Sequence, residues 1–159
     1  MINCKFENVN NALLRHVTVG VIVLDARKKK VLLVKRGLQL QNPNKWVFPG
    51  GFLSRDETTR ECAVRETLEE TGYKVKIERL FRINDNPLRP KEDRQNVDFC
   101  YIAVVGRKIG KPDSESSEVK WIDLNNLPKE KDWAYDHGET LHLYINWTHK
   151  HFQIPLLNE

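Results

Sequence analysis

One short stretch of the sequence, residues 65–70 (RETLEE), limits the folds open to this chain more than any other. Around it, the alternation seen in neighbouring segments gives way to a spacing typical of a helix, and Gly72 ends that pattern. We therefore predict an α-helix over residues 58–71. Three carboxylates stand at positions i, i+3 and i+4 of this helix: Glu66, Glu69 and Glu70. Such residues share one face, with Cβ atoms about 5–6 Å apart. Val64 and Leu68 are expected to form a buried aliphatic stripe roughly opposite.

Three carboxylates this close repel one another, by a few tenths of a kcal/mol per pair in water and by more when partly buried. A divalent cation would offset the repulsion, because hard oxygen ligands at this spacing suit Mg²⁺ or Mn²⁺. The turn at residues 49–51 (PGG) lets the backbone approach a ligand closely, so a main-chain carbonyl there can join the same ion. The alternative is a solvated acidic helix face that holds no ligand.

Glu57 is expected to stand apart from this cluster. It precedes Glu66 by nine residues, which on a helix turns its side chain about 180° away from the acidic face. Ser54 and Glu57 have the Ser-x-x-Glu spacing of a capping box. Glu57 also lies eight residues before Arg65, with which it can form an ion pair. Both interpretations give Glu57 a structural role.

The remaining sequence predicts strands and one further helix. Segments rich in β-branched and alternating apolar residues predict strands at 16–24, 31–35, 73–82, 97–105 and 119–122. Residues 85–96 are polar and are expected to form a long loop, and residues 138–151 are expected to form a closing helix. The core contacts expected from that helix are Leu141, Leu143, Tyr144 and Trp147. Strands interleaved with two helices predict an α/β domain around a mixed sheet.

Composition argues for one globular domain over residues 1–159. Hydrophobic residues make up 40% and charged residues 30%, and no apolar run approaches the ~20 residues of a membrane span. The N-terminus has no basic region followed by an apolar region, so no secretory signal is visible. The widely spaced Cys4, Cys62 and Cys100 predict no disulfide framework and no zinc site, which favours a reducing cytoplasm. A net charge of +4 suits polyanionic small molecules as well as nucleic acids.

Residues 51–73 resemble the signature of a known family, the Nudix box. The pattern is G-x5-E-x7-R-E-U-x-E-E-x-G-U, where U is a bulky apolar residue. The six fixed positions after the first glycine are all present: Glu57, Arg65, Glu66, Glu69, Glu70 and Gly72. Thr67 departs from the pattern, because it stands where the family prefers an aliphatic residue. This change is expected to affect helix packing without removing a metal ligand.

The resemblance implies a hydrolase that cleaves a nucleoside diphosphate linked to another moiety and releases a nucleoside monophosphate. It also implies the α/β/α Nudix sandwich with a central mixed sheet. Box glutamates of the family bind Mg²⁺ or Mn²⁺, and the residue before the box glycine offers its carbonyl. The implied metal ligands here are Gly50, Glu66, Glu69 and Glu70. The family arginine, Arg65 in this chain, would orient the carboxylates.

Catalysis by such a site would use water activated by the metal, with a carboxylate as proton acceptor. We predict Glu69 as ligand or base, and Glu118, just before the strand at 119–122, as a second candidate base. The candidate substrate-binding residues are Arg36, Arg89, Arg94 and Tyr135. His137 is interpreted as a residue at the start of the last helix without a catalytic role.

Two segments, 85–96 and 133–140, are similar to members of the family that hydrolyse ADP-ribose. ADP-ribose or a nucleotide-sugar is therefore the leading substrate hypothesis, with the proline landmark of that subgroup near Pro87 or Pro90. The alternatives are a non-catalytic regulator that senses ADP-ribose and an RNA 5′-end pyrophosphohydrolase. Neither DNA nor a membrane is an expected partner, because no room for a winged helix follows the last helix and no span exists. A homodimer is a hypothesis by analogy, with the first strand as its candidate edge.

Overall fold

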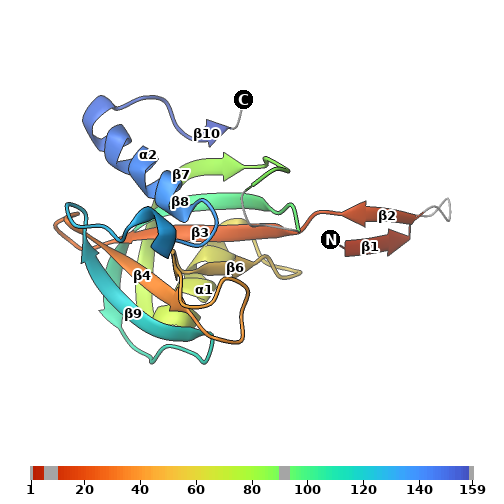
Figure 1. Ribbon diagram of the computed structural model, residues 1–159, viewed down its shortest axis with the longest axis horizontal. Coiled ribbons are helices and arrows are strands. Elements are labelled where there is room, and N and C mark those ends of the chain that lie inside the picture. The colour runs from red at the N-terminus through yellow and green to blue at the C-terminus, as the bar shows by residue number, and fades with distance from the viewer. Residues whose placement is uncertain (1, 6–10, 90–93, 158–159) are drawn as a thin grey trace.

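The computed structural model describes residues 2–5, 11–89 and 94–157 and contains one large mixed β-sheet between two helices (Figure 1). The strands of this sheet are β3 (Val17–Leu24), β4 (Lys30–Arg36), β5 (Trp46–Val47), β6 (Gly50–Phe52), β7 (Tyr73–Asn84), β8 (Val97–Lys108), β9 (Ser116–Asp123) and β10 (Leu156–Leu157). The helices are α1 (Thr59–Thr71), α2 (His137–Lys150) and the short 3₁₀ helix η1 (Glu130–Asp132). A separate hairpin of β1 (Ile2–Lys5) and β2 (Asn11–Leu14) projects from the body (Figure 1).

The main sheet has the strand order β10-β7-β8-β3-β4-β5, with β6 paired to β3 and β9 paired to β4. β3 and β8 run parallel, as do β7 and β10, whereas β7 and β8 are antiparallel. The prediction of an α/β fold with a central mixed sheet is therefore confirmed.

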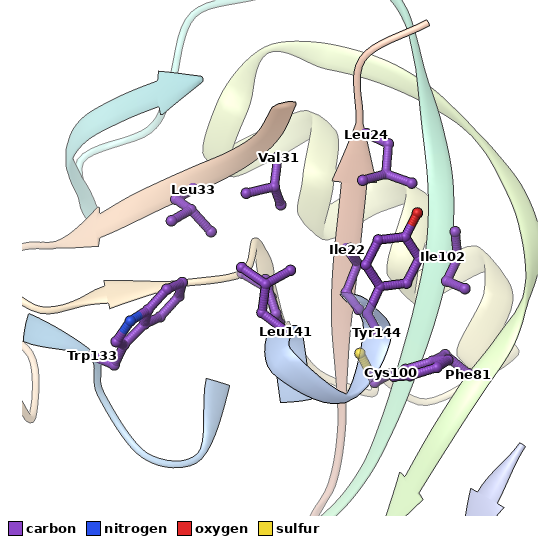
Figure 2. Close-up of a cluster of buried hydrophobic side chains, with 11 residues drawn as sticks. Ile22, Leu24, Val31, Leu33, Phe81, Cys100, Ile102, Trp133, Leu141 and Tyr144 are labelled. Atoms are coloured by element: carbon purple, nitrogen blue, oxygen red, sulfur yellow. The ribbon is translucent and has the colours of Figure 1, made fainter. Parts of the chain in front are cut away.

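The two helices cover opposite faces of the sheet, and β3 contributes side chains to the core cluster on each face. Ile22 and Leu24 join one cluster, which also contains Leu141 of α2 (Figure 2). Val21 and Val23, which alternate with them, join a second cluster on the α1 side. Neighbouring strand residues point to opposite faces, so β3 is buried on both and connects the layers. The predicted core contacts of the last helix are confirmed, since all four pack in or against the first cluster.

The capping box of helix α1 lies later in the chain than predicted. The Thr58 hydroxyl accepts a hydrogen bond from the Glu61 N–H at 3.2 Å, and the Glu61 carboxylate accepts one from the Thr58 N–H at 2.8 Å. This pair is the capping box, so the assignment to Ser54 and Glu57 was wrong. Gly72 closes the helix with a φ of 74°, in the left-handed region that favours glycine.

The buried side of α1 is built from small side chains, not from an aliphatic stripe. The buried residues are Cys62, Ala63, Thr67 and Thr71, whereas Val64 is exposed and Leu68 only partly buried. The prediction of a buried Val64–Leu68 stripe was therefore wrong. The Thr67 hydroxyl donates to the Ala63 carbonyl at 2.7 Å, which satisfies its polar group inside the core. Small residues on this side let the helix backbone lie close to the sheet.

The structure also bears on the predicted dimer edge, the cysteines and the proline landmark. The first predicted strand corresponds to β3, which lies inside the sheet between β8 and β4, so it offers no free edge for a second chain. The three cysteines are free thiols, and Cys100 lies in the core. Pro90 falls outside the described residues. Among those that are described, no helix is long and apolar enough to cross a bilayer.

Candidate active site

The turn before α1 brings the backbone directly against the acidic helix face. A Cβ added at Gly51 would lie 2.5 Å from the Glu66 carboxyl carbon, so only glycine leaves room for that carboxylate in its present position. The Gly50 N–H donates to Glu70 Oε2 at 2.9 Å. The glycine turn at residues 49–51 therefore lies against the carboxylates of Glu66 and Glu70, as the predicted metal site requires.

Arg65 holds three carboxylates with one guanidinium group. Its Nη2 donates to Glu57 at 2.7 Å, and its Nη1 donates to Glu66 at 2.8 Å and to Glu69 at 3.0 Å. The predicted ion pair between Glu57 and Arg65 is confirmed, and hydrogen bonding from Arg65 lowers the pKa of Glu57 to about 2. Glu57 thus anchors Arg65, which in turn fixes two of the acidic side chains on the pocket side.

The acidic face is short of positive charge at its buried end. Burial, followed by repulsion from Glu66, Asp113 and Glu115, raises the pKa of Glu70 to about 8. Burial also raises the pKa of Glu66, although Arg65 opposes that shift. Carboxyl groups in such surroundings gain from a nearby cation, because it stabilises their ionised form.

Asp113 and Glu115 were missed by the sequence analysis. They lie between β8 and β9, and the Asp113 N–H donates to the Glu69 carbonyl at 3.0 Å, which docks this segment on the end of α1. Both line the same pocket as the box glutamates. Their signal in the sequence was weak, since no regular spacing links them to α1 and only the folded chain brings them there.

Glu118, the predicted second base, is placed elsewhere. It pairs across the sheet with Lys35 of β4, where Lys35 Nζ lies 3.6 Å from its Oε2, and it is absent from the residues that line the pocket. Among the acidic residues of this region, the structure brings Glu115 rather than Glu118 next to the glutamate cluster.

A pocket of about 600 Å³ joins the acidic face to a basic side. Its lining includes all the predicted metal ligands and all the predicted substrate-binding residues: Gly50, Glu66, Glu69, Glu70, Arg36, Arg89, Arg94 and Tyr135. Arg65 lies behind this lining and reaches the site through the carboxylates that it holds. One cavity therefore offers carboxylates for a cation and guanidinium groups for an anion.

The three pocket arginines contact different partners, and Arg36 also donates to the Gln41 carbonyl at 2.6 Å. Arg36 lies over the Tyr135 ring, 5.5 Å from its centre, and Arg94 lies over Phe52 at 5.4 Å. Arg89 is buried and donates to Asp136 at 2.6 Å. Against the effect of burial, Arg89 keeps the pKa of Asp136 below its ordinary value. Arg89 is thus a fixed cation.

His137 lies on the pocket wall with a defined proton position. The Phe48 N–H donates to its Nδ1 at 3.0 Å, so that nitrogen carries a lone pair and the neutral ring has its proton on Nε2. Burial lowers the pKa of His137 to about 4. The ring is therefore neutral near pH 7 and presents an N–H donor.

The donor chemistry of the acidic face suits a divalent ion. Within residues 2–5, 11–89 and 94–157, no three acidic, histidine or cysteine side chains are already grouped as they would be around an ion, because the carboxylates bond to Arg65 and Gly50. Their hard oxygens beside a glycine turn nevertheless match the ligands of Mg²⁺ and Mn²⁺. The close approach of the Glu66 carboxylate to Gly51 and the raised pKa of Glu70 fit a site that a cation would complete.

Comparisons with known proteins agree with this fold. Residues 14–144 match the NUDIX domain. The chain is 34% identical over 134 residues to the ADP-ribose pyrophosphatase of Methanocaldococcus jannaschii, covering 83% of this chain and 75% of that protein. It is 31% identical to the mRNA-decapping enzyme subunit 2 of Arabidopsis thaliana, covering 88% of this chain but only 37% of the plant protein. The crystal structure of a NUDIX hydrolase from Nitrosomonas europaea matches with a TM-score of 0.75 and 27% identity, over 94% of this chain and 81% of that one.

The fold and the box thus define an α/β hydrolase of the nucleotide-processing kind. The chain belongs to the Nudix family.

Proposed function

We propose that this protein is a Mg²⁺- or Mn²⁺-dependent hydrolase of the pyrophosphate linkage in a nucleoside diphosphate joined to a second moiety. ADP-ribose or a nucleotide-sugar is the leading substrate, and a nucleoside monophosphate is released. The observation that carries this proposal is that one pocket is lined both by the box glutamates and by Arg36, Arg89 and Arg94. A pyrophosphate needs both, since its negative charge repels a nucleophile until cations neutralise it.

In this proposal Glu66, Glu69, Glu70 and the Gly50 carbonyl hold the ion. A bound divalent ion would neutralise phosphate charge and lower the pKa of a water molecule. Arg65 acts as a positioning residue, because it holds Glu66 and Glu69 at 2.8 and 3.0 Å. The oxygen of the attacking water bonds to phosphorus as the bridging P–O bond breaks, and its proton passes to a carboxylate. We assign that base to Glu115 if Glu69 is a ligand of the ion, and to Glu69 if it is not; both residues line the pocket.

The remaining lining would bind the two ends of the substrate. Arg36 and Arg94, which lie over aromatic rings, and Arg89, which donates to Asp136, would supply positive charge to the phosphate oxygens. The archaeal relative named ADP-ribose pyrophosphatase supports ADP-ribose as the first substrate to test. We also propose that residues 1–159 act as a single cytoplasmic domain.

The test is a product analysis with purified protein and either Mg²⁺ or Mn²⁺. ADP-ribose should yield AMP and ribose 5-phosphate, and EDTA should abolish turnover. The same panel includes nucleotide-sugars, dinucleotide polyphosphates and nucleoside triphosphates. Failure to cleave any of them with either metal would contradict the proposed function. Tight ADP-ribose binding without cleavage would instead favour the regulator.

RNA 5′-end hydrolysis is a second candidate, and the similarity to the plant decapping subunit favours it. The chain spans 37% of that protein, so the activity of the whole relative does not transfer directly. Release of pyrophosphate from a 5′-triphosphorylated RNA, at a rate above that seen with ADP-ribose, would select this candidate over the first.

A further inference from the structure

One polar wall of the pocket has no part in the chemistry proposed above. Thr18 and Asp98 are register partners on the parallel strands β3 and β8, and the Thr18 hydroxyl donates to Asp98 Oδ1 at 2.7 Å. Both residues line the pocket. The second oxygen, Asp98 Oδ2, accepts no hydrogen bond from any residue in the described part of the chain. Asp98 therefore offers an acceptor to the cavity, well removed in sequence from the Nudix box.

His137 offers the matching donor on the same wall. Its Nδ1 is occupied by the Phe48 N–H, so the free position of the ring is Nε2–H. No residue within the described ranges accepts a hydrogen bond from Nε2, and the ring lines the pocket. Sequence analysis gave His137 no role, because nothing in the sequence shows which of its nitrogens faces a cavity.

Gly20 and Phe48 lie between these two groups. A Cβ added at Gly20 would lie 3.7 Å from Asp98 Oδ2 and 3.9 Å from the Phe48 ring, whose centre lies 5.1 Å from that of His137. Phe48 is only 3% exposed and packs edge-on against Trp133, so it presents no ring face on which a base could stack. The wall thus pairs an acceptor and a donor without a stacking surface between them.

Sugar hydroxyl groups match this arrangement better than a nucleobase does. Each hydroxyl both donates and accepts, so neighbouring hydroxyls satisfy a carboxylate and an imidazole N–H together. Burial raises the pKa of Asp98, and a hydroxyl can bond to this side chain whether it is ionised or protonated. A hydrogen bond at this site replaces little water, because Asp98 is already partly shielded.

We propose that Asp98 Oδ2 and His137 Nε2 bind hydroxyl groups of the substrate's sugar and are specificity-determining residues of this enzyme. The inference rests on the proposed function, since it places the phosphates at the acidic face of the same pocket. The hydroxyls belong either to the ribose of the nucleoside or to the sugar beyond the pyrophosphate. The chemistry of the contact is the same for both sources, and the experiment separates them.

The experiment compares three substrates with the wild type and two variants. The substrates are ADP-ribose, 2′-deoxy-ADP-ribose and an ADP alkyl ester that lacks the second sugar. Asp98→Ala removes the acceptor and should raise KM for ADP-ribose by about tenfold, as expected for a lost hydrogen bond to a charged group, with little change in kcat. Thr18→Val is the matched control, because it breaks the same Thr18–Asp98 bond but keeps the carboxylate. It should raise KM much less.

His137→Phe should raise KM for ADP-ribose in the same direction, by several-fold, because it removes the N–H and keeps a flat ring. Should Asp98→Ala fail to fold, Asp98→Asn tests the same claim at nearly constant volume, with a several-fold rise in KM expected.

The penalty of Asp98→Ala should vanish on one analogue. If it vanishes with the 2′-deoxy compound, the nucleoside ribose is the partner; if it vanishes with the alkyl ester, the second sugar is. An equal penalty on all three substrates, or an equal rise in KM for Thr18→Val, would overturn the inference. Calorimetric binding of the same compounds in EDTA, where turnover is absent, separates the two proposals. If binding shows this pattern of penalties in the variants but the wild type never hydrolyses the compounds, only the proposed function is contradicted.

Discussion

Arg65 donates to Glu57, Glu66 and Glu69 at once, which makes one guanidinium the organiser of the acidic face. A planar group with five N–H donors can serve three carboxylates, whereas a lysine ammonium cannot hold the same geometry. Glu70 is held differently, by the Gly50 N–H and by burial. Three glutamates of the box are therefore positioned by Arg65, and the fourth, Glu70, is positioned by the backbone.

Replacing Glu70 with glutamine should separate charge from structure. In Glu70→Gln the amide oxygen can still accept from the Gly50 N–H, so the fold should persist. The charge that would hold a cation is lost, and kcat with Mg²⁺ should fall by about 100-fold or more. Steady-state kinetics and thermal unfolding measured on one preparation check both expectations. Full activity in this variant would remove Glu70 from the proposed site.

Gly51→Ala should impair activity more than stability. The added Cβ meets the end of the Glu66 side chain, 2.5 Å from its carboxyl carbon, and that flexible end can swing aside at small cost. Displacing the carboxylate should lower kcat by about tenfold or more, with a small change in Tm. Gly110→Ala is the matched control, since its nearest contact would be an ordinary 3.6 Å. Equal kinetics for both variants would count against the assigned role of Glu66.

Helical spacing alone could supply only the acidic side of this site. Glu66, Glu69 and Glu70 were found because helical spacing alone puts them on one face. Asp113 and Glu115 were not, because they reach the pocket only when their segment docks on the end of α1. Glu118 was chosen as a candidate base because it lies just before a predicted strand, but the register of β4 and β9 pairs it with Lys35 instead.

At the scale of elements, α1 connects a core contact made by small side chains to an acidic face that lines the pocket. Its residue range was predicted to within one residue. Its buried side was not predicted, since Cys62, Ala63 and Thr67 take the place of the expected aliphatic pair. Helical periodicity identifies faces, whereas closeness of packing decides whether large or small residues fill them. Thr67 keeps its hydroxyl bonded to the Ala63 carbonyl, which explains how a polar residue fits an apolar position of the family pattern.

The capping box of α1 gives a prediction for this element. Thr58→Ala removes the hydroxyl that accepts from the Glu61 N–H at 3.2 Å, and it should lower the free energy of unfolding by about 1 kcal/mol. Chemical denaturation measures the change. Ser54→Ala is the control, because Ser54 takes part in its hydrogen bond with Glu57 through the backbone N–H. A larger loss for Ser54→Ala than for Thr58→Ala would contradict the observed start of the helix.

Helix α2 gives a prediction about pH. The pKa of His137, about 4 in the folded protein, lies below the ~6.5 of an exposed histidine. The unfolded chain therefore binds more protons between these values, and stability contributed at neutral pH is lost as pH falls from about 6.5 to 4. We expect a loss on the order of 3 kcal/mol for this group. Denaturation at several pH values should show a smaller slope over this interval in His137→Gln, and an unchanged slope would refute the assignment.

At the scale of the whole molecule, the site depends on segments from both halves of the sequence. Gly50 and the α1 glutamates form one side of the pocket, while Arg89, Asp98 and the start of α2 contribute others. Sequence patterns predicted the class of fold and five of the ten described strands, β3, β4, β7, β8 and β9, because these longer strands carry apolar alternation or runs. They missed β1, β2, β5, β6 and β10, which are too short for a periodic signal.

The central claim is that the acidic face holds a divalent ion where a pyrophosphate can reach it. Crystals grown with Mn²⁺ and a non-hydrolysable ADP-ribose analogue, measured for anomalous scattering, test it most directly. The account predicts a strong manganese peak among Glu66, Glu69, Glu70 and the Gly50 carbonyl, with analogue phosphate oxygens beside it. A well-ordered analogue in the pocket with no manganese peak at these residues would contradict the claim.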